Sequence, residues 1–149
     1  MIEVAFTGTQ VGWSAKQYDA VSDWVWALTT GDPTLYRLHH GDCVGADANM
    51  HELCFEMGWQ IMVHPPVDPK KRAFVHNTRF WEPERCEMLP EKPYLERNHD
   101  MVDVGGVLYA TPKEKEEQLR SGTWATVRYA KKVHVPTILF YRDGTQRAA

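Results

Sequence analysis

The sequence lacks the features that mark several large protein classes. Its three cysteines, Cys43, Cys54 and Cys86, form no CxxC pair, and an odd number suits free thiols in a reducing compartment better than a disulfide framework. No apolar run approaches the roughly 20 residues that span a bilayer. The N-terminal MIEVAFTG also has no basic region ahead of an apolar stretch. We therefore expect a cytoplasmic protein that does not associate with membranes.

A large excess of charge of one sign is also missing. The net charge of −3 argues against a protein that coats nucleic acid, although it allows a local basic patch. The length of 149 residues, 43% of them hydrophobic, is enough for one domain with a core of its own. We expect a single domain over residues 1–149.

Common cofactor and metal motifs are absent. Neither GxGxxG nor GxxxxGK[ST] occurs, which disfavours ordinary NAD enzymes and phosphate-loop NTPases. The seven histidines show no ligand spacing such as HxxxH, and the adjacent His39 and His40 should point to opposite faces of a strand. Cys43 could be a nucleophile at a helix start, but no base is identifiable and a buried cysteine is commoner. We expect no metal and no cofactor.

What the sequence does contain is a regular alternation of strand-like and helix-like patterns. Strand-like runs occupy residues 2–7, 36–40, 59–64, 107–110 and 136–141. Helical patterns begin near Ser14, Ala46, Pro93 and Ser121. This order predicts an α/β fold, a Rossmann-like three-layer sandwich with a mainly parallel sheet of about five strands and helices on both faces.

One segment does not fit this alternation. Residues 65–92 are rich in proline and charge and are long for a connector inside a compact domain, so we predict a lid or partner loop there. The basic run at residues 70–72, followed by Arg79 and the pair Phe80-Trp81, leaves contact with nucleic acid open. A solvated loop or ligand lid is the favoured alternative.

Ligands of parallel sheets bind beyond the carboxyl ends of the strands, and the residues there form a coherent set. They are Thr7, Gly8 and Thr9 after the first strand, Gly41, Asp42, Gly45, Ala46 and Asp47 after the second, His64 and Pro65 after the third, Thr111 and Pro112 after the fourth, and Ser121, Gly122 and Thr123 at the last helix start. The turns GDCVGAD and SGT each join a glycine to a helix N-terminus, where free N–H groups and the helix dipole favour an anion such as phosphate. The alternative is that these residues only make tight turns and helix caps.

Other residues allow both a binding and a structural interpretation. Arg97 could clamp a phosphate or carboxylate with two parallel hydrogen bonds, or it could be a solvated helix arginine. Asp47 could cap its helix or bind a ribose hydroxyl. Three aromatic residues near predicted strand ends could stack on a base or pack in the core: Trp13, Tyr109 and Trp124.

Four motifs, in the order FTGT, HGDCVGAD, ERNHD and SGTWATV, resemble the SLOG superfamily. This Rossmann-like group contains the DNA-processing Smf proteins and the Lonely Guy phosphoribohydrolases, and the chain is most similar to its small standalone YspA-type members. The resemblance implies a nucleotide or nucleotide-derived, ADP-ribose-type ligand. It places that ligand on the turn of residues 41–47, the pair Arg97-Asn98 and the turn of residues 121–123. It also implies a homo-oligomer.

The resemblance fails at the position that carries catalysis. Lonely Guy enzymes read GGxGTxxE in the last turn, and that glutamate serves glycosidic cleavage, whereas residues 122–127 here contain no carboxylate. We therefore predict no catalytic residue and expect a sensor or sequestering protein without turnover. One alternative is an N-glycoside hydrolase that uses another carboxylate, from Asp42, Asp47, Glu96 or Asp100. The other is a DNA-processing accessory that binds single-stranded DNA.

Overall fold

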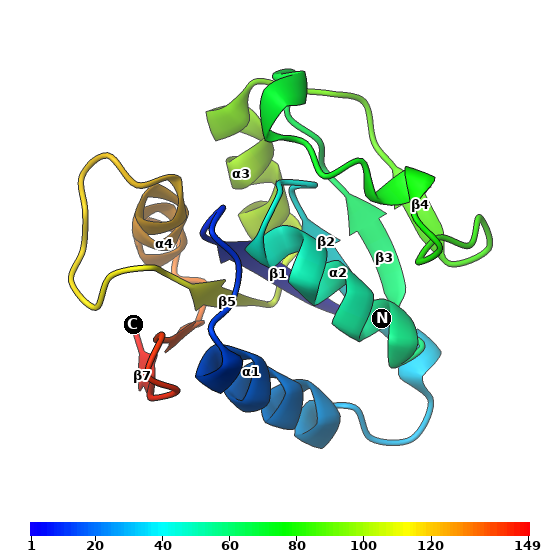
Figure 1. Cartoon of the computed structure of the whole chain (residues 1–149), viewed down its shortest axis with the longest axis horizontal. Coiled ribbons are helices and arrows are strands. Elements are labelled where there is room, and N and C mark those ends of the chain that lie inside the picture. Colours follow the sequence, from blue (N-terminus) through cyan, green and yellow to red (C-terminus); the bar gives the residue numbers. More distant parts are fainter.

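The computed structural model describes residues 1–149 and confirms the α/β fold. A seven-stranded sheet with the order β4-β3-β2-β1-β5-β6-β7 lies between four helices, α1 and α2 on one face and α3 and α4 on the other (Figure 1). The strands are β1 (Ile2–Gly8), β2 (Tyr36–His40), β3 (Gln60–Val63), β4 (Cys86–Met88), β5 (Val107–Thr111), β6 (Thr137–Phe140) and β7 (Gln146–Ala148). The helices are α1 (Ala15–Leu28), α2 (Ala46–Glu56), α3 (Tyr94–Val104) and α4 (Gly122–Lys132).

The prediction of about five strands was too low. All five predicted strands form, but β4 and β7 extend the sheet at its two edges, and β7 is the one antiparallel strand. Each has three residues, which is too short for a periodic pattern. All three residues of β7 are also exposed, so no apolar signal marks it in the sequence.

The segment of residues 65–92 packs against the edge of the sheet and contributes a strand to it. Besides β4 it contains two short 3-10 turns, and its Val75 and Cys86 belong to the main hydrophobic core. The Nε atom of Arg72 lies 2.8 Å from Oδ2 of Asp42, in the turn after β2. The backbone N–H of Ala73 donates to the carbonyl of that same aspartate at 2.7 Å. A role of this segment as a lid or partner loop stays a prediction.

The central strand β1 is buried on both faces and separates two cores. Val4 and Phe6 point to the larger core under α1 and α2, whereas Ala5 points to the smaller core under α3 and α4. This alternation follows from the pleat of a strand, and burial of both faces is what a parallel sheet requires. None of the helices combines the length and apolar character that crossing a bilayer requires.

Two of the predicted helix starts are capped as the sequence indicates. The Ser14 hydroxyl accepts the N–H of Gln17, and the Gln17 side chain accepts the N–H of Ser14, which completes a capping box. The Ser121 hydroxyl accepts the N–H of Trp124 at 3.2 Å. The start of α2 differs, because its N-cap residue Gly45 has a positive φ of 88° and no side chain to cap the helix. Glycine alone adopts this conformation without strain.

The end of β1 passes so close to α2 and β5 that a side chain does not fit there. A Cβ atom on Gly8 would lie 2.4 Å from both Ala46 Cβ and Thr111 Oγ1. We expect Gly8→Ala to lower the free energy of unfolding by about 1–3 kcal/mol, as overpacking of a core does. Gly106→Ala is the matched control, since its Cβ would meet nothing closer than 3.5 Å. Equal urea midpoints for the two variants would contradict this account.

Candidate functional site

A cavity of about 270 Å³ lies at the carboxyl edge of the sheet, between the end of β1, the start of α3, the loop after β5 and the start of α4. Five of its lining residues are predicted site residues: Gly8, Thr9, Ser121, Gly122 and Thr123. The fold thus brings two turns from opposite ends of the chain to one place. We call it the edge cavity.

The start of α4 presents unused hydrogen-bond donors to the edge cavity. The backbone N–H groups of Gly122 and Thr123 have no acceptor within the chain, because they belong to the first helical turn. A Cβ atom on Gly122 would lie 1.8 Å from Oη of Tyr94, so a side chain at this position would displace the Tyr94 ring. Free N–H groups at the positive end of a helix dipole form an anion-binding surface.

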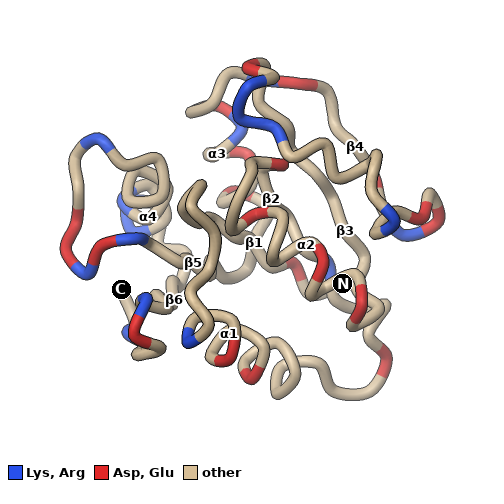
Figure 2. Tube along the Cα trace, viewed as in Figure 1, with Lys and Arg blue, Asp and Glu red and all other residues tan.

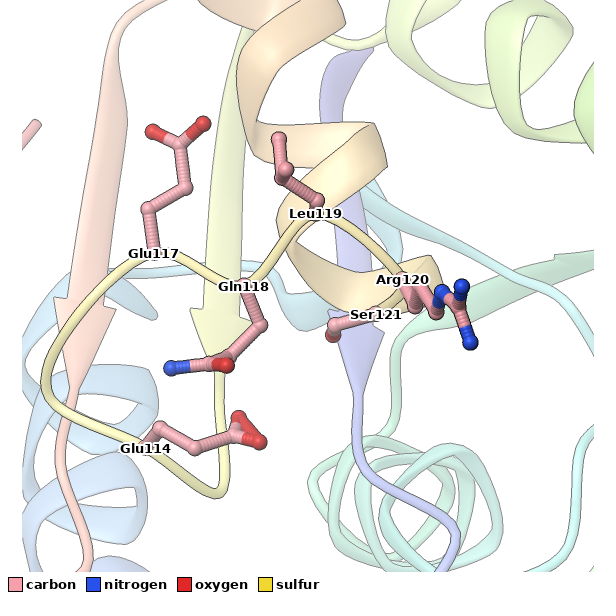
Figure 3. Close-up of a pocket in the computed structure, with 6 residues that line it drawn as sticks. All are labelled: Glu114, Glu117, Gln118, Leu119, Arg120 and Ser121. Atoms are coloured by element: carbon pink, nitrogen blue, oxygen red, sulfur yellow. The ribbon is translucent and has the colours of Figure 1, made fainter.

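The loop between β5 and α4 frames a second, more open cavity of about 600 Å³ that shares Glu114 and Ser121 with the edge cavity. In Figure 3 the Glu114 side chain extends from the loop toward the start of α4. Arg128 holds the loop in place, since its guanidinium donates to the Glu117 carboxylate and to the Gln118 and Leu119 carbonyls. Charges of both signs follow one another along this loop (Figure 2).

The predicted carboxylates after β2 already have hydrogen-bond partners within the chain. Asp47 Oδ2 accepts the N–H groups of Gly41 and Cys43, both at 3.1 Å. Asp42 is fully buried and accepts the Val75 N–H as well as the Arg72 guanidinium. Neither aspartate lines the edge cavity. Direct contact of these residues with a ligand stays a prediction.

The turn after β2 also contacts residues that line the edge cavity. The N–H of Ala46 donates to the carbonyl of Thr9 at 3.0 Å, which ties the start of α2 to the loop after β1. A Cβ atom on Gly45 would lie 2.3 Å from the carbonyl oxygen of Gln10. Thr7 is buried at the end of β1. These residues therefore hold Thr9 and Gln10 in position.

Arg97 is buried, so the alternative of a solvated helix arginine is wrong. Its guanidinium lies over the ring of Tyr94 at 4.6 Å and its Nη2 is 3.3 Å from Cys43 Sγ. A Cβ atom on Gly41 would lie only 1.2 Å from its Nη1. Arg97 Nε and Nδ2 of the neighbouring, equally buried Asn98 have no hydrogen-bond partner. Neither residue lines the edge cavity.

Burial also bears on whether Cys43 is a nucleophile and on whether the aromatic residues stack on a ligand or pack in the core. Burial raises the pKa of Cys43 to about 11, which disfavours a thiolate nucleophile. Trp124 and Tyr109 are buried in the two cores and are therefore packing residues. Trp13 is half-buried and donates its indole N–H to Thr111 Oγ1 at 3.1 Å.

Four residues that line the edge cavity were not predicted from the sequence. They are Gln10, Tyr94, Lys113 and Glu114. Gln10 follows the predicted Thr9 directly, and Lys113 and Glu114 follow the Pro112 that comes after β5, so an extension of each strand-end turn would have found them. Tyr94 starts α3 and carries no local signal of this kind.

No protein-family model and no curated protein matches this chain. The functional interpretation therefore depends on the geometry of the site. Within that geometry, no three histidine, cysteine or carboxylate side chains are arranged to bind a metal ion.

The buried titratable groups around this edge predict how stability depends on pH. Burial lowers the pKa of four histidines, His39, His40, His51 and His64, the last to about 4. The unfolded chain takes up protons below about pH 6.5 while the folded state resists them, so stability is present above this pH and is lost as the pH falls toward 4. We expect urea midpoints to decrease between about pH 7 and pH 5.

Asp47 should act in the opposite direction. Burial raises its pKa to about 6, so the folded state takes up a proton as the pH falls from about 6 to 4, which offsets part of the loss. Asp47→Asn keeps an oxygen for the two N–H donors but removes this titration, and we expect its stability to fall more steeply with acid. A parent protein whose midpoint does not change over this range would refute the assignment of neutral buried histidines.

Proposed function

We propose that the protein binds a phosphate-bearing, nucleotide-type ligand in the edge cavity and acts as a sensor or sequestering protein without turnover. The observation that carries the proposal is the pair of free N–H groups of Gly122 and Thr123, two residues that line the edge cavity together with Gly8 and Thr9. Phosphate complements such donors because it is a compact anion with several acceptor oxygens.

The charges around the edge cavity support a ligand with both an anionic and a hydroxyl-bearing part. Lys113 supplies a cation, and the first turn of α4 contains no acidic residue. Glu114 supplies a carboxylate, which accepts hydrogen bonds from hydroxyl groups such as those of ribose. The adjoining 600 Å³ cavity leaves room for a base, and sites for small molecules commonly measure about 300–1,000 Å³.

Membership of the SLOG superfamily and assembly into a homo-oligomer are part of this proposal. The sheet order, the strand-end turns and the anion-binding start of α4 are compatible with the motif resemblance. The missing glutamate in residues 122–127 supports binding without cleavage.

A phosphate-bearing ligand should stabilise the protein more than its nucleoside does. At 100 times the dissociation constant, binding adds about 2.7 kcal/mol to the free energy of unfolding, which a melting curve detects. We expect AMP and ADP-ribose to raise the melting temperature and adenosine to have a much smaller effect. Equal shifts for AMP and adenosine would count against the phosphate site.

Ser121 and Ser14 offer a matched pair of variants for this test. Both cap a helix, so each serine-to-alanine change should cost about 1 kcal/mol of stability. Only Ser121 lines the edge cavity, so Ser121→Ala should weaken AMP binding about tenfold while Ser14→Ala leaves the affinity unchanged. The opposite pattern, or an equal loss in both variants, would place the ligand elsewhere.

The second candidate function, N-glycoside hydrolysis, is favoured by one observation. Glu114 is the one carboxylate that lines the edge cavity, and cleavage of such a bond needs an acid, a base or a stabilising carboxylate. We expect no free adenine beyond one equivalent when the protein is incubated with AMP and the products are separated by chromatography. Release over many turnovers that Glu114→Gln abolishes would establish the hydrolase instead.

A further inference from the structure

Two pairs of buried histidines lie on opposite faces of the sheet. His40 points toward α2, and its Nε2 is 2.8 Å from Nδ1 of His51. His39 points to the other face, and its Nδ1 is 2.9 Å from Nε2 of His64, just after β3. All four rings are buried. The pairs look alike, but they differ in how their outer nitrogens are used.

The pair on the α2 face is closed. His51 Nε2 lies 2.6 Å from the carbonyl oxygen of Phe80, so this nitrogen carries the proton and donates it. His51 Nδ1 then accepts from Nε2–H of His40, and His40 Nδ1 accepts the backbone N–H of Asp42 at 3.0 Å. Every ring nitrogen has a partner within the chain, which is what a structural pair requires.

The pair on the α3 face is open at one end. Partial burial raises the pKa of Glu3, but hydrogen bonds from Arg37 and His39 outweigh it, and the resulting pKa is lowered. The ionised carboxylate can only accept, so His39 Nε2 donates to it and His39 Nδ1 accepts from Nε2–H of His64. This order leaves the lone pair of His64 Nδ1 without a partner within the chain, since the one hydrogen bond of this ring is made by its Nε2.

His64 lines a cavity of about 450 Å³ between the end of β3, the turn before α3 and α3 itself. Arg97 lies in the same lining, and its guanidinium donates within the chain only to the sulfur of Cys43. Met62, Leu89 and Val104 provide apolar walls. The cavity therefore combines an acceptor and a donor, both on side chains more than nine-tenths buried, with apolar surface around them.

We propose that this cavity is a second binding site and takes a neutral, planar ligand that presents an N–H group beside a carbonyl, as a cyclic amide or imide does. The N–H group would donate to His64 Nδ1, and the carbonyl would accept from Arg97. The lining contains two cations, Lys92 and Arg97, and two carboxylates, Asp100 and Asp103, so its formal charges balance. A charged ligand would lose its hydration without meeting a net opposite charge in the lining, which favours a neutral one.

In this arrangement Glu3 and His39 are positioning residues. Glu3 fixes the tautomer of His39, and His39 fixes that of His64, so the ring facing the cavity stays an acceptor. This inference does not depend on the proposed function, since Ser121 and Gly122 line the edge cavity and not this one.

Uracil and 1,3-dimethyluracil test the proposal, because they share the ring and the carbonyl groups but only uracil has N–H groups. With ¹⁵N-labelled histidine in the full chain, we expect His64 to show a protonated Nε2 and a bare Nδ1 near neutral pH. Uracil should shift the Nδ1 signal of His64 and leave that of His51 unchanged. The dimethyl compound should bind about tenfold more weakly.

Two results would overturn the proposal. One is a His64 ring protonated on Nδ1. The other is a uracil titration to about 10 mM, well above a dissociation constant of ~1 mM, that leaves the His64 signals unchanged or moves them no more than dimethyluracil does. His64→Leu should lose the uracil response. The comparison of the two ligands uses the parent protein, so it decides the matter even if this variant does not fold.

Discussion

The buried guanidinium of Arg97 is the group on which the carboxyl edge of the sheet depends. A charge removed from water needs compensation. The charge of Arg97 acts on the buried carboxylate of Asp47 in the adjoining turn, where it opposes the rise in pKa that burial causes. A side chain at Gly41 would displace the guanidinium, which occupies that space. The same guanidinium supports the ring of Tyr94, whose hydroxyl reaches Gly122. One buried cation thus links α3 to the turn after β2 and to the start of α4.

The residues show which parts of this architecture a sequence can reveal. Strands with several apolar positions were predicted within one or two residues, because their periodic pattern is local, whereas β4 and β7 are too short to have one. The glycines and serine at the edge cavity were also predicted, because turn and cap chemistry is local. The orientation of Asp42 was not, since it depends on Arg72 and on the N–H of Val75, which lie far along the chain.

The histidines illustrate the same limit in another way. Sequence spacing correctly separated His39 from His40 onto opposite faces, but it gave no indication that each pairs with a histidine of another element. Such pairs are stable in a core only because every buried nitrogen finds a partner or a cavity. The difference between the closed and the open pair is therefore a property of the tertiary structure alone. The open pair places the acceptor nitrogen of His64 beside α3, whereas the edge cavity lies at the N-terminal end of that helix.

The antiparallel strand β7 has a consequence for association between molecules. It pairs with Ile138, Leu139 and Phe140 of β6, so these apolar residues do not present an open backbone edge to another chain. An uncovered apolar edge strand is a template for intermolecular pairing and aggregation. The new outer edge is short and exposed and carries Arg147, whose charge disfavours the approach of another apolar strand. β7 thereby covers the backbone edge of β6, to which a strand of another chain could otherwise add.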